Sequence, residues 1–221
     1  MWKIFDWISH PHGYHMCWLK DLPDCHNSAV AQDIAELCAK EGHLAASIFC
    51  NGASGGLNSL NFFPTVASQF TISIPPLELP ILQAIRDDPS ILQRPVHKQL
   101  QKLIVEPLLT LRGSLPSQMV VVIDSLDACE ELVDAVISMT ETLWNHQLPL
   151  QIFATSQFEL YQRVNWSHPQ FRRMTCLLDV DYLECWKSWI MPSSNLGKVP
   201  IHNKANVYQV NCSSWELHAL D

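Results

Sequence analysis

Short apolar runs divide the first 180 residues into expected strands. They are rich in β-branched residues and lack regular polar alternation, which is typical of strands buried on both faces of a parallel sheet. The longest unbroken run ends at an acidic residue, Asp124. The pattern predicts strands at residues 16–19, 44–50, 119–124, 150–154 and 171–178.

Apolar residues at helical spacing separate these strands. Ser28 is a suitable cap for a helix over residues 29–41, and Gly42 suits the left-handed position after its end. Further helices are expected at 62–73, with Pro64 in the first turn, and at 75–88, 96–111 and 130–146. The pattern places Leu79, Leu82 and Ile85 along one side of the 75–88 helix and predicts a kink at Pro107.

The order of these elements predicts an α/β fold of three layers, with a parallel sheet flanked by helices. Strand, loop, helix and strand are followed by a helical insert and two more strands, which is the layout of P-loop nucleotide-binding domains. We expect a connector at residues 1–15 and the P-loop NTPase-like domain at 16–178. Residues 179–221 show no sustained periodicity and are expected to form an irregular tail, truncated or disordered.

Composition and charge narrow the possible functions. Hydrophobic residues make up 48% of the chain and charged residues 16%, which predicts a substantial core and a partly apolar surface that suits a protein partner. The net charge of −8 argues against broad binding to nucleic acid or to an anionic membrane. No apolar run approaches the roughly 18 residues of a membrane span.

The eight cysteines form no Cys-x-x-Cys pair, and several lie within apolar runs. Buried thiols in a reducing compartment are the simplest interpretation, and because the first residues do not resemble a signal peptide, a cytoplasmic location is expected. A zinc site is an alternative near the N-terminus, although the spacing fits no standard finger and exposed loop histidines are the simpler explanation. Its candidate ligands are His10, His12, His15, Cys17, Cys25 and His26.

The run that ends at Asp124 is the strongest candidate for a functional site. A buried strand delivers its last residue to the carboxyl edge of the sheet, where open α/β folds bind ligands. An acid there can hold Mg²⁺ beside a nucleotide phosphate, and Asp127 follows three residues later. The simpler alternative is an aspartate that only caps the following helix.

Seven ordered blocks point to a known family. They read IFDWISHPHG, WLKDLPDCHNSAVAQDIAELCAKEGHLAASIF, NSLNFFPTVASQF, SIPPLELPILQAIRDDPSIL, QLQKLIVEPLL, VVVIDSLDAC and IFATSQFE. From about residue 5 to about residue 159, the chain resembles a NACHT domain of the signal-transduction class of P-loop NTPases. The resemblance is to the type found at the N-terminus of nephrocystin-3-like proteins and in fungal NLR-like proteins.

Three motifs depart from that family at charged or glycine positions. The family's phosphate loop resembles G-P-A-G-[AS]-G-K-S, whereas residues 21–28 read DLPDCHNS, with Asn27 at the lysine position and only Ser28 kept. In the second motif, Ala128 stands where the family has a glutamate. In the third, Gln157 stands where the family has an arginine.

The resemblance implies where a nucleotide site would lie. Asp124 and Ser28 would support Mg²⁺, and Asp127 is the one candidate for a catalytic role. The positions of the degenerate nucleotide site are Asn27, Ser28, Asp124, Asp127 and Ser156.

The lost charges predict a pseudo-NTPase with no cofactor, because a phosphate loop without glycines and lysine holds phosphates poorly. We therefore expect a signalling or scaffold module that acts through protein partners, either itself or related NACHT proteins, and through oligomerisation. One alternative is a functional ATP switch that binds ATP with Mg²⁺ and hydrolyses it weakly or not at all. Another is a truncated gene product without selected function.

Overall fold

The computed structural model describes residues 7–8, 13–21, 27–50, 58–115, 118–157, 159–160, 162, 164 and 171–178, apart from the side chains of residues 21, 27 and 129–131. The predictions for the tail at 179–221, and those for most of the connector, lie outside these residues. Within this part of the chain, no helix combines the length and the apolar character needed to cross a membrane.

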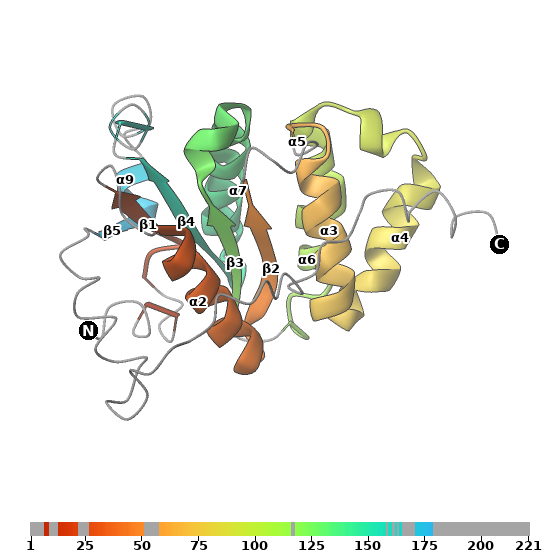
Figure 1. The fold of residues 1–221 in the computed structure, drawn as a ribbon. Coiled ribbons are helices and arrows are strands. Elements are labelled where there is room, and N and C mark those ends of the chain that lie inside the picture. Colours follow the sequence, from red (N-terminus) through yellow and green to blue (C-terminus); the bar gives the residue numbers. More distant parts are fainter. Residues whose placement is uncertain are drawn as a thin grey trace, which may run out of the picture.

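A five-stranded parallel sheet forms the centre of the molecule (Figure 1), which confirms the predicted α/β class and the P-loop NTPase-like fold. The strand order is β2-β3-β4-β1-β5, so that β4 separates β1 from β3 although it follows both in the chain. The strands are β1 (Met16–Asp21), β2 (Leu44–Phe49), β3 (Met119–Asp124), β4 (Leu150–Gln157) and β5 (Thr175–Leu178).

Helices cover both faces of the sheet, and Figure 1 shows the helices of the insert grouped beyond β2. The main helices are α2 (Asn27–Lys40), α3 (Phe62–Ser73), α4 (Glu78–Asp87), α5 (Val96–Gln99), α6 (Glu106–Thr110), α7 (Val133–His146) and α9 (Phe171–Met174). Short 3₁₀ turns span Pro75–Leu77, Ile91–Gln93 and Leu126–Leu132, and a π-helical turn spans Leu100–Val105.

Successive side chains of each strand point to opposite faces of the sheet, so the buried residues form two clusters, one on each face. Val120 and Val122 of β3 pack in one cluster with α2, Trp7 and Ile8. Val121 and Ile123 belong to the larger cluster on the opposite face, with α3, α7 and α9. Because successive strand residues point to opposite faces, an unbroken apolar run satisfies both clusters at once.

The outer edge of β2 is closed by side chains from α3. The side-chain oxygen of Gln69 accepts from the Ser47 backbone N–H at 2.7 Å, and its Nε2 donates to the Ser47 carbonyl at 3.0 Å. The Ser73 hydroxyl donates to the carbonyl of Ala45. These bonds satisfy three backbone groups of β2 that face away from β3, at the edge of the described sheet.

Several local predictions are confirmed. Helix α3 begins and ends at the predicted residues, with Pro64 in its first turn. Gly42 adopts φ 76°, the left-handed conformation expected after α2. Ser28, predicted to precede α2, is instead its second residue.

Other local predictions were right in part. Of the predicted row, Ile85 is partly buried and packs against the core, but Leu79 is 76% exposed and Leu77 and Ile81 are buried instead. The helix predicted at 96–111 contains a π-helical turn just before Pro107, where the N–H of Glu106 reaches the carbonyl of Gln101. The strand predicted at 171–178 is divided between α9 and β5.

Candidate functional site

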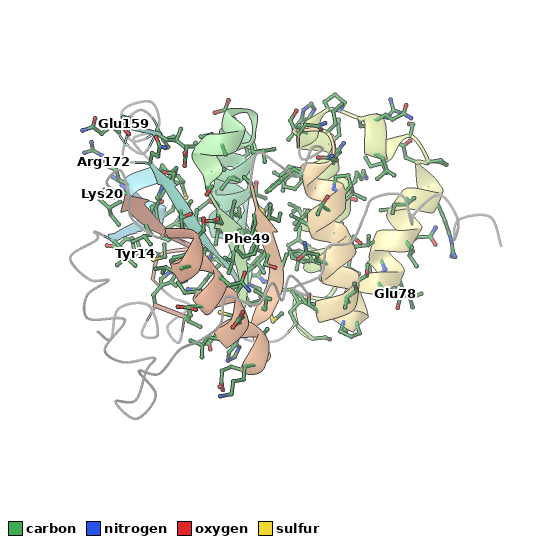
Figure 2. All side chains as sticks on the ribbon, viewed as in Figure 1. Tyr14, Lys20, Phe49, Glu78, Glu159 and Arg172 are labelled. Carbon is green, nitrogen blue, oxygen red and sulfur yellow. The ribbon has the colours of Figure 1, made fainter. Side chains whose placement is uncertain are left out.

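The carboxyl ends of β1, β4 and β3 lie next to one another along one edge of the sheet. Leu19 of β1 pairs with Thr155 of β4, and Ile123 of β3 pairs with Ala154. Figure 2 places the labelled residue Lys20 at this end of β1. This edge, near the order reversal between β1 and β3, is where doubly wound folds bind ligands.

Asp124 is fully buried at this edge and is held by two hydroxyl groups. Thr155 Oγ1 donates to Asp124 Oδ1 at 2.7 Å, and Ser125 Oγ donates to Oδ2 at 3.2 Å. The Ser125 backbone N–H donates in turn to Thr155 Oγ1 at 2.9 Å. The two strand ends are therefore joined by a closed hydrogen-bonded unit around the carboxylate, as a buried charge requires.

Ser125 turns the chain sharply after β3. Its φ of 57° lies in the left-handed region, which costs a non-glycine residue of order 1 kcal/mol or more. In this conformation Ser125 directs its N–H to Thr155 and its hydroxyl to Asp124. Its carbonyl accepts the Ala128 N–H at 2.9 Å, which starts the following 3₁₀ turn.

Asp127 holds the end of β4. Its Oδ1 accepts from the backbone N–H of Gln157 at 2.9 Å. Ala128, at the position of the family's glutamate, is exposed and has no side chain that could activate water. The second acid therefore supports the backbone of the third motif, and a catalytic role for Asp127 stays untested.

Ser156 is turned toward the core. Its hydroxyl accepts from the indole N–H of Trp18 at 2.8 Å and donates to the Gln157 carbonyl at 3.0 Å, and the side chain is only 2% exposed. The Trp18 ring is itself fixed edge to face against Phe171, with centroids 5.7 Å apart. This predicted nucleotide position thus serves as the anchor of a buried tryptophan.

Ser28 lies exposed in the first turn of α2. The helix follows the carboxyl end of β1, so its N-terminus lies at the same sheet edge as Asp124, and its first turn contains no acidic residue. A helix N-terminus carries partial positive charge that favours anions. No hydrogen bond in the described part of the chain joins Ser28 to Asp124, and the side chain of Asn27 lies outside it.

The structure thus joins Asp124 and Asp127 to the end of β4 through Thr155 and Gln157. Ser156, between these two residues, bonds instead to Trp18, and Ser28 lies on a separate element. The connecting residue, Thr155, was not among the predicted site residues. Its position directly after a buried apolar run was the available signal, but the sequence did not reveal that β4 lies beside β3. Trp18 and Ser125 were missed for the same reason, since their roles depend on contacts with neighbouring strands.

The zinc alternative gains no support. His15 and Cys17 are buried, and the other four candidate ligands lie outside the described residues. Among the residues that are described, no group of three or more His, Cys, Asp and Glu is placed to hold a metal ion. Burial lowers the pKa of His15, opposed by a backbone hydrogen bond with Leu148.

Comparison with known proteins identifies one family. The family model described as Nephrocystin 3, N-terminal matches residues 3–157, which is more than half of the 221-residue chain and includes β1 to β4. This match confirms the resemblance drawn from the seven sequence blocks. The chain matches no curated protein and no solved structure.

Proposed function

Because the chain belongs to the nephrocystin 3 N-terminal family, we propose that it is a NACHT-like signalling or scaffold module whose ATP site is degenerate. In this proposal it acts through protein partners and oligomerisation, in the cytoplasm, and turns over no nucleotide. The partners are other copies of the chain or related NACHT proteins.

One observation carries the proposal. The buried aspartate at the end of β3 is kept, whereas the charged residues that would contact phosphates or activate water are replaced. Asp124 keeps its place at the end of β3, with both carboxylate oxygens hydrogen-bonded by neighbouring hydroxyls. The positions that would contact phosphates or activate water hold Asn27, Ala128 and Gln157. Loss of the lysine contact alone removes roughly 1.5–3 kcal/mol of phosphate binding.

Acidic residues in the phosphate loop weaken binding further. Asp21 and Asp24 stand where the family has glycines, and their carboxylates would repel a polyphosphate. A glycine-free loop also prevents the close approach of backbone N–H groups that cradles phosphates. Together these changes favour a module that is locked in one nucleotide-independent state.

A titration of the full chain with fluorescently labelled ATP and Mg²⁺ tests the proposal. We expect no saturable binding tighter than about 1 mM. Micromolar binding that disappears in Asp124→Asn, which keeps the size of the side chain, would overturn it. An intact near-ultraviolet circular dichroism spectrum of that variant would show that the loss is local.

An ATP-binding switch without hydrolysis is the second candidate. The observation in its favour is the first turn of α2, where exposed Ser28 and the positive end of the helix face the same sheet edge as Asp124. The same titration distinguishes the two candidates, since the switch requires binding that Ser28→Ala weakens.

A chain without selected function is the third possibility, and its folding state tests it. A cooperative thermal unfolding transition of the purified chain, followed by circular dichroism, supports a working module. A gradual change without a transition would favour the third possibility instead.

A further inference from the structure

Cys17 and Cys176 lie directly opposite each other on neighbouring strands, away from the candidate nucleotide site. They are register partners in the parallel pairing of β1 with β5. Both side chains pack in the cluster on the α2 face, and the two thiols are hydrogen-bonded to each other. Both residues are in the thiol form.

The spacing of the two strands suits a covalent bond between these thiols. Neighbouring strands are about 4.8 Å apart, and disulfides join Cα atoms that are roughly 4.4–6.8 Å apart. Since register partners project to the same face of a sheet, the two Cβ atoms lie about as far apart as the strands. Disulfides join Cβ atoms roughly 3.5–4.5 Å apart, so β5 would have to move slightly toward β1 for the bond to close. Because Cys17 and Cys176 are already paired, the register of β5 against β1 does not have to change.

The two thiols differ in their access to solvent. Cys17 is 1% exposed on an inner strand, and burial, followed by the hydrogen bond and charge of Cys176, raises its pKa well above the ordinary value. Cys176 is partly exposed on β5, the outermost strand on its side of the described sheet. A reagent from solvent therefore meets Cys176 first.

We propose that Cys17 and Cys176 form a reversible disulfide by exchange with a small-molecule disulfide such as oxidised glutathione. The Cys176 thiolate attacks one sulfur of the reagent, whose S–S bond breaks and releases one glutathione thiolate. The Cys17 sulfur then attacks the Cys176 sulfur of the mixed disulfide, its proton passes to the leaving sulfur, and the second glutathione is released as the thiol. The protein loses two electrons and two protons, and oxidised glutathione is reduced to two molecules of glutathione.

The bond would tie together two segments that are far apart in the chain. Cys17 belongs to β1, which leads into α2, whereas Cys176 belongs to β5, which leads toward residue 179 and beyond. In the reduced protein, β5 is a short strand of four residues, and within the described sheet it pairs with β1. The oxidised protein would hold β5, and the chain that follows it, fixed to the centre of the sheet.

Peptide mapping of the full chain tests the proposal. The protein is equilibrated in glutathione buffers of increasing oxidised fraction, blocked with N-ethylmaleimide and digested without reduction. We expect a linked peptide pair containing positions 17 and 176, two hydrogens lighter than the two peptides together, that disappears on reduction. The measurement uses the wild-type chain and so does not depend on a variant that folds.

Three variants test the order of the steps. In Cys17→Ser, a glutathione adduct is expected to accumulate at Cys176, because no second thiol resolves it. In Cys176→Ser neither product should form, and Cys38→Ser, which removes another buried thiol of the same cluster, should leave the linked pair unchanged. A wild-type protein that stops at the Cys176 adduct, links Cys176 elsewhere or stays unmodified at both positions would overturn the proposal.

Discussion

The hydroxyl of Thr155 donates a 2.7 Å hydrogen bond to Oδ1 of Asp124, from the strand beside the one that ends at this aspartate. The same hydroxyl accepts the N–H of Ser125, whose backbone adopts a left-handed conformation. One side chain therefore stabilises both a buried charge and a strained turn. In the proposed degenerate site these residues would be retained for this reason, because they also hold the sheet edge together.

Replacing Thr155 tests this structural role. Thr155→Val keeps the shape of the side chain but removes a hydrogen bond to a charged group, so we expect unfolding free energy to fall by about 2–3 kcal/mol. Thr155→Ser keeps the hydroxyl and is expected to lose less than half as much. Urea denaturation at neutral pH measures both, and equal losses would show that the methyl group rather than the hydroxyl matters.

Restoring the missing groups should create a nucleotide site. The variant combines Asp21→Gly, Asp24→Gly, His26→Gly, Asn27→Lys and Ala128→Glu. Its lysine contact alone is expected to improve ATP affinity about 10- to 100-fold over the wild type in the same titration. Adding Asp124→Asn to this variant should abolish the gain if the restored site uses Mg²⁺. A folded variant that binds no better than wild type would show that the surrounding scaffold no longer fits a nucleotide.

The amide of Gln69 has a measurable role at the edge of β2. Gln69→Met keeps most of the volume but leaves the N–H and the carbonyl of Ser47 without their partners. We expect a loss of about 2–4 kcal/mol in unfolding free energy, since buried backbone groups without partners cost about 1–3 kcal/mol each. Gln83→Met is the matched control, because the bond that Gln83 makes to Asp87 is exposed to solvent. Similar losses in both variants would contradict this role.

Glycine is favoured at both left-handed helix ends, so adding one at position 147 and removing the one at position 42 should have opposite effects. Gln147, after α7, has φ 51°, so Gln147→Gly is expected to raise unfolding free energy by about 0.5–1 kcal/mol despite the loss of its side-chain bond to the Trp144 carbonyl. Gly42→Ala should lower it by about 1 kcal/mol. No atom lies within 4 Å of an added Cβ at Gly42, so the cost is conformational alone. Thermal unfolding of the two variants checks both signs.

The buried His15 predicts a dependence of stability on pH. Burial lowers the pKa of His15 below its ordinary value of 6.5, so the unfolded chain takes up a proton before the folded protein does. This contribution to stability is fully present above pH 6.5. It decreases as the pH falls below that value, until the folded-state pKa is passed.

Urea midpoints at about pH 7.5 and about pH 5 measure this effect in wild type and in His15→Gln. The wild type should lose more stability than the variant between the two conditions. The difference between the proteins isolates His15 from the carboxylates that titrate in both. Equal losses of stability in the wild type and the variant would show that groups other than His15 cause the pH dependence.

The sequence predicted elements whose burial is decided locally. Residues 62–73 carry a helical pattern and the β-branched run before Asp124 favours a buried strand, so both were located correctly. Leu79 was misplaced because Pro75 and Pro76 form a 3₁₀ turn, which rotates the following helix and brings Ile81 inward. A single helical pattern over residues 75–88 ignores that turn and therefore places Leu79 on the buried side.

The sequence predicted the site residues at the end of each strand but not the contacts between strands. Asp124 and Asp127 could be found from a strand end followed by acids, but their partners Thr155 and Gln157 lie about thirty residues away on β4. No local pattern states that β4 inserts between β1 and β3. Contacts such as that of Trp18 with Ser156 depend on that insertion and therefore became visible only in three dimensions.

The bonds from Gln69 and Ser73 to β2 also limit how copies of this module can assemble. A neighbouring molecule that extended the sheet beside β2 by backbone pairing would have to displace these side chains, because they already bond the Ala45 carbonyl and both backbone groups of Ser47. Any ring or filament that forms through this side and keeps these bonds must therefore join helix surfaces. Its geometry would be set by individual side chains, so single surface substitutions on α3 and α4 should disassemble it without unfolding the subunits.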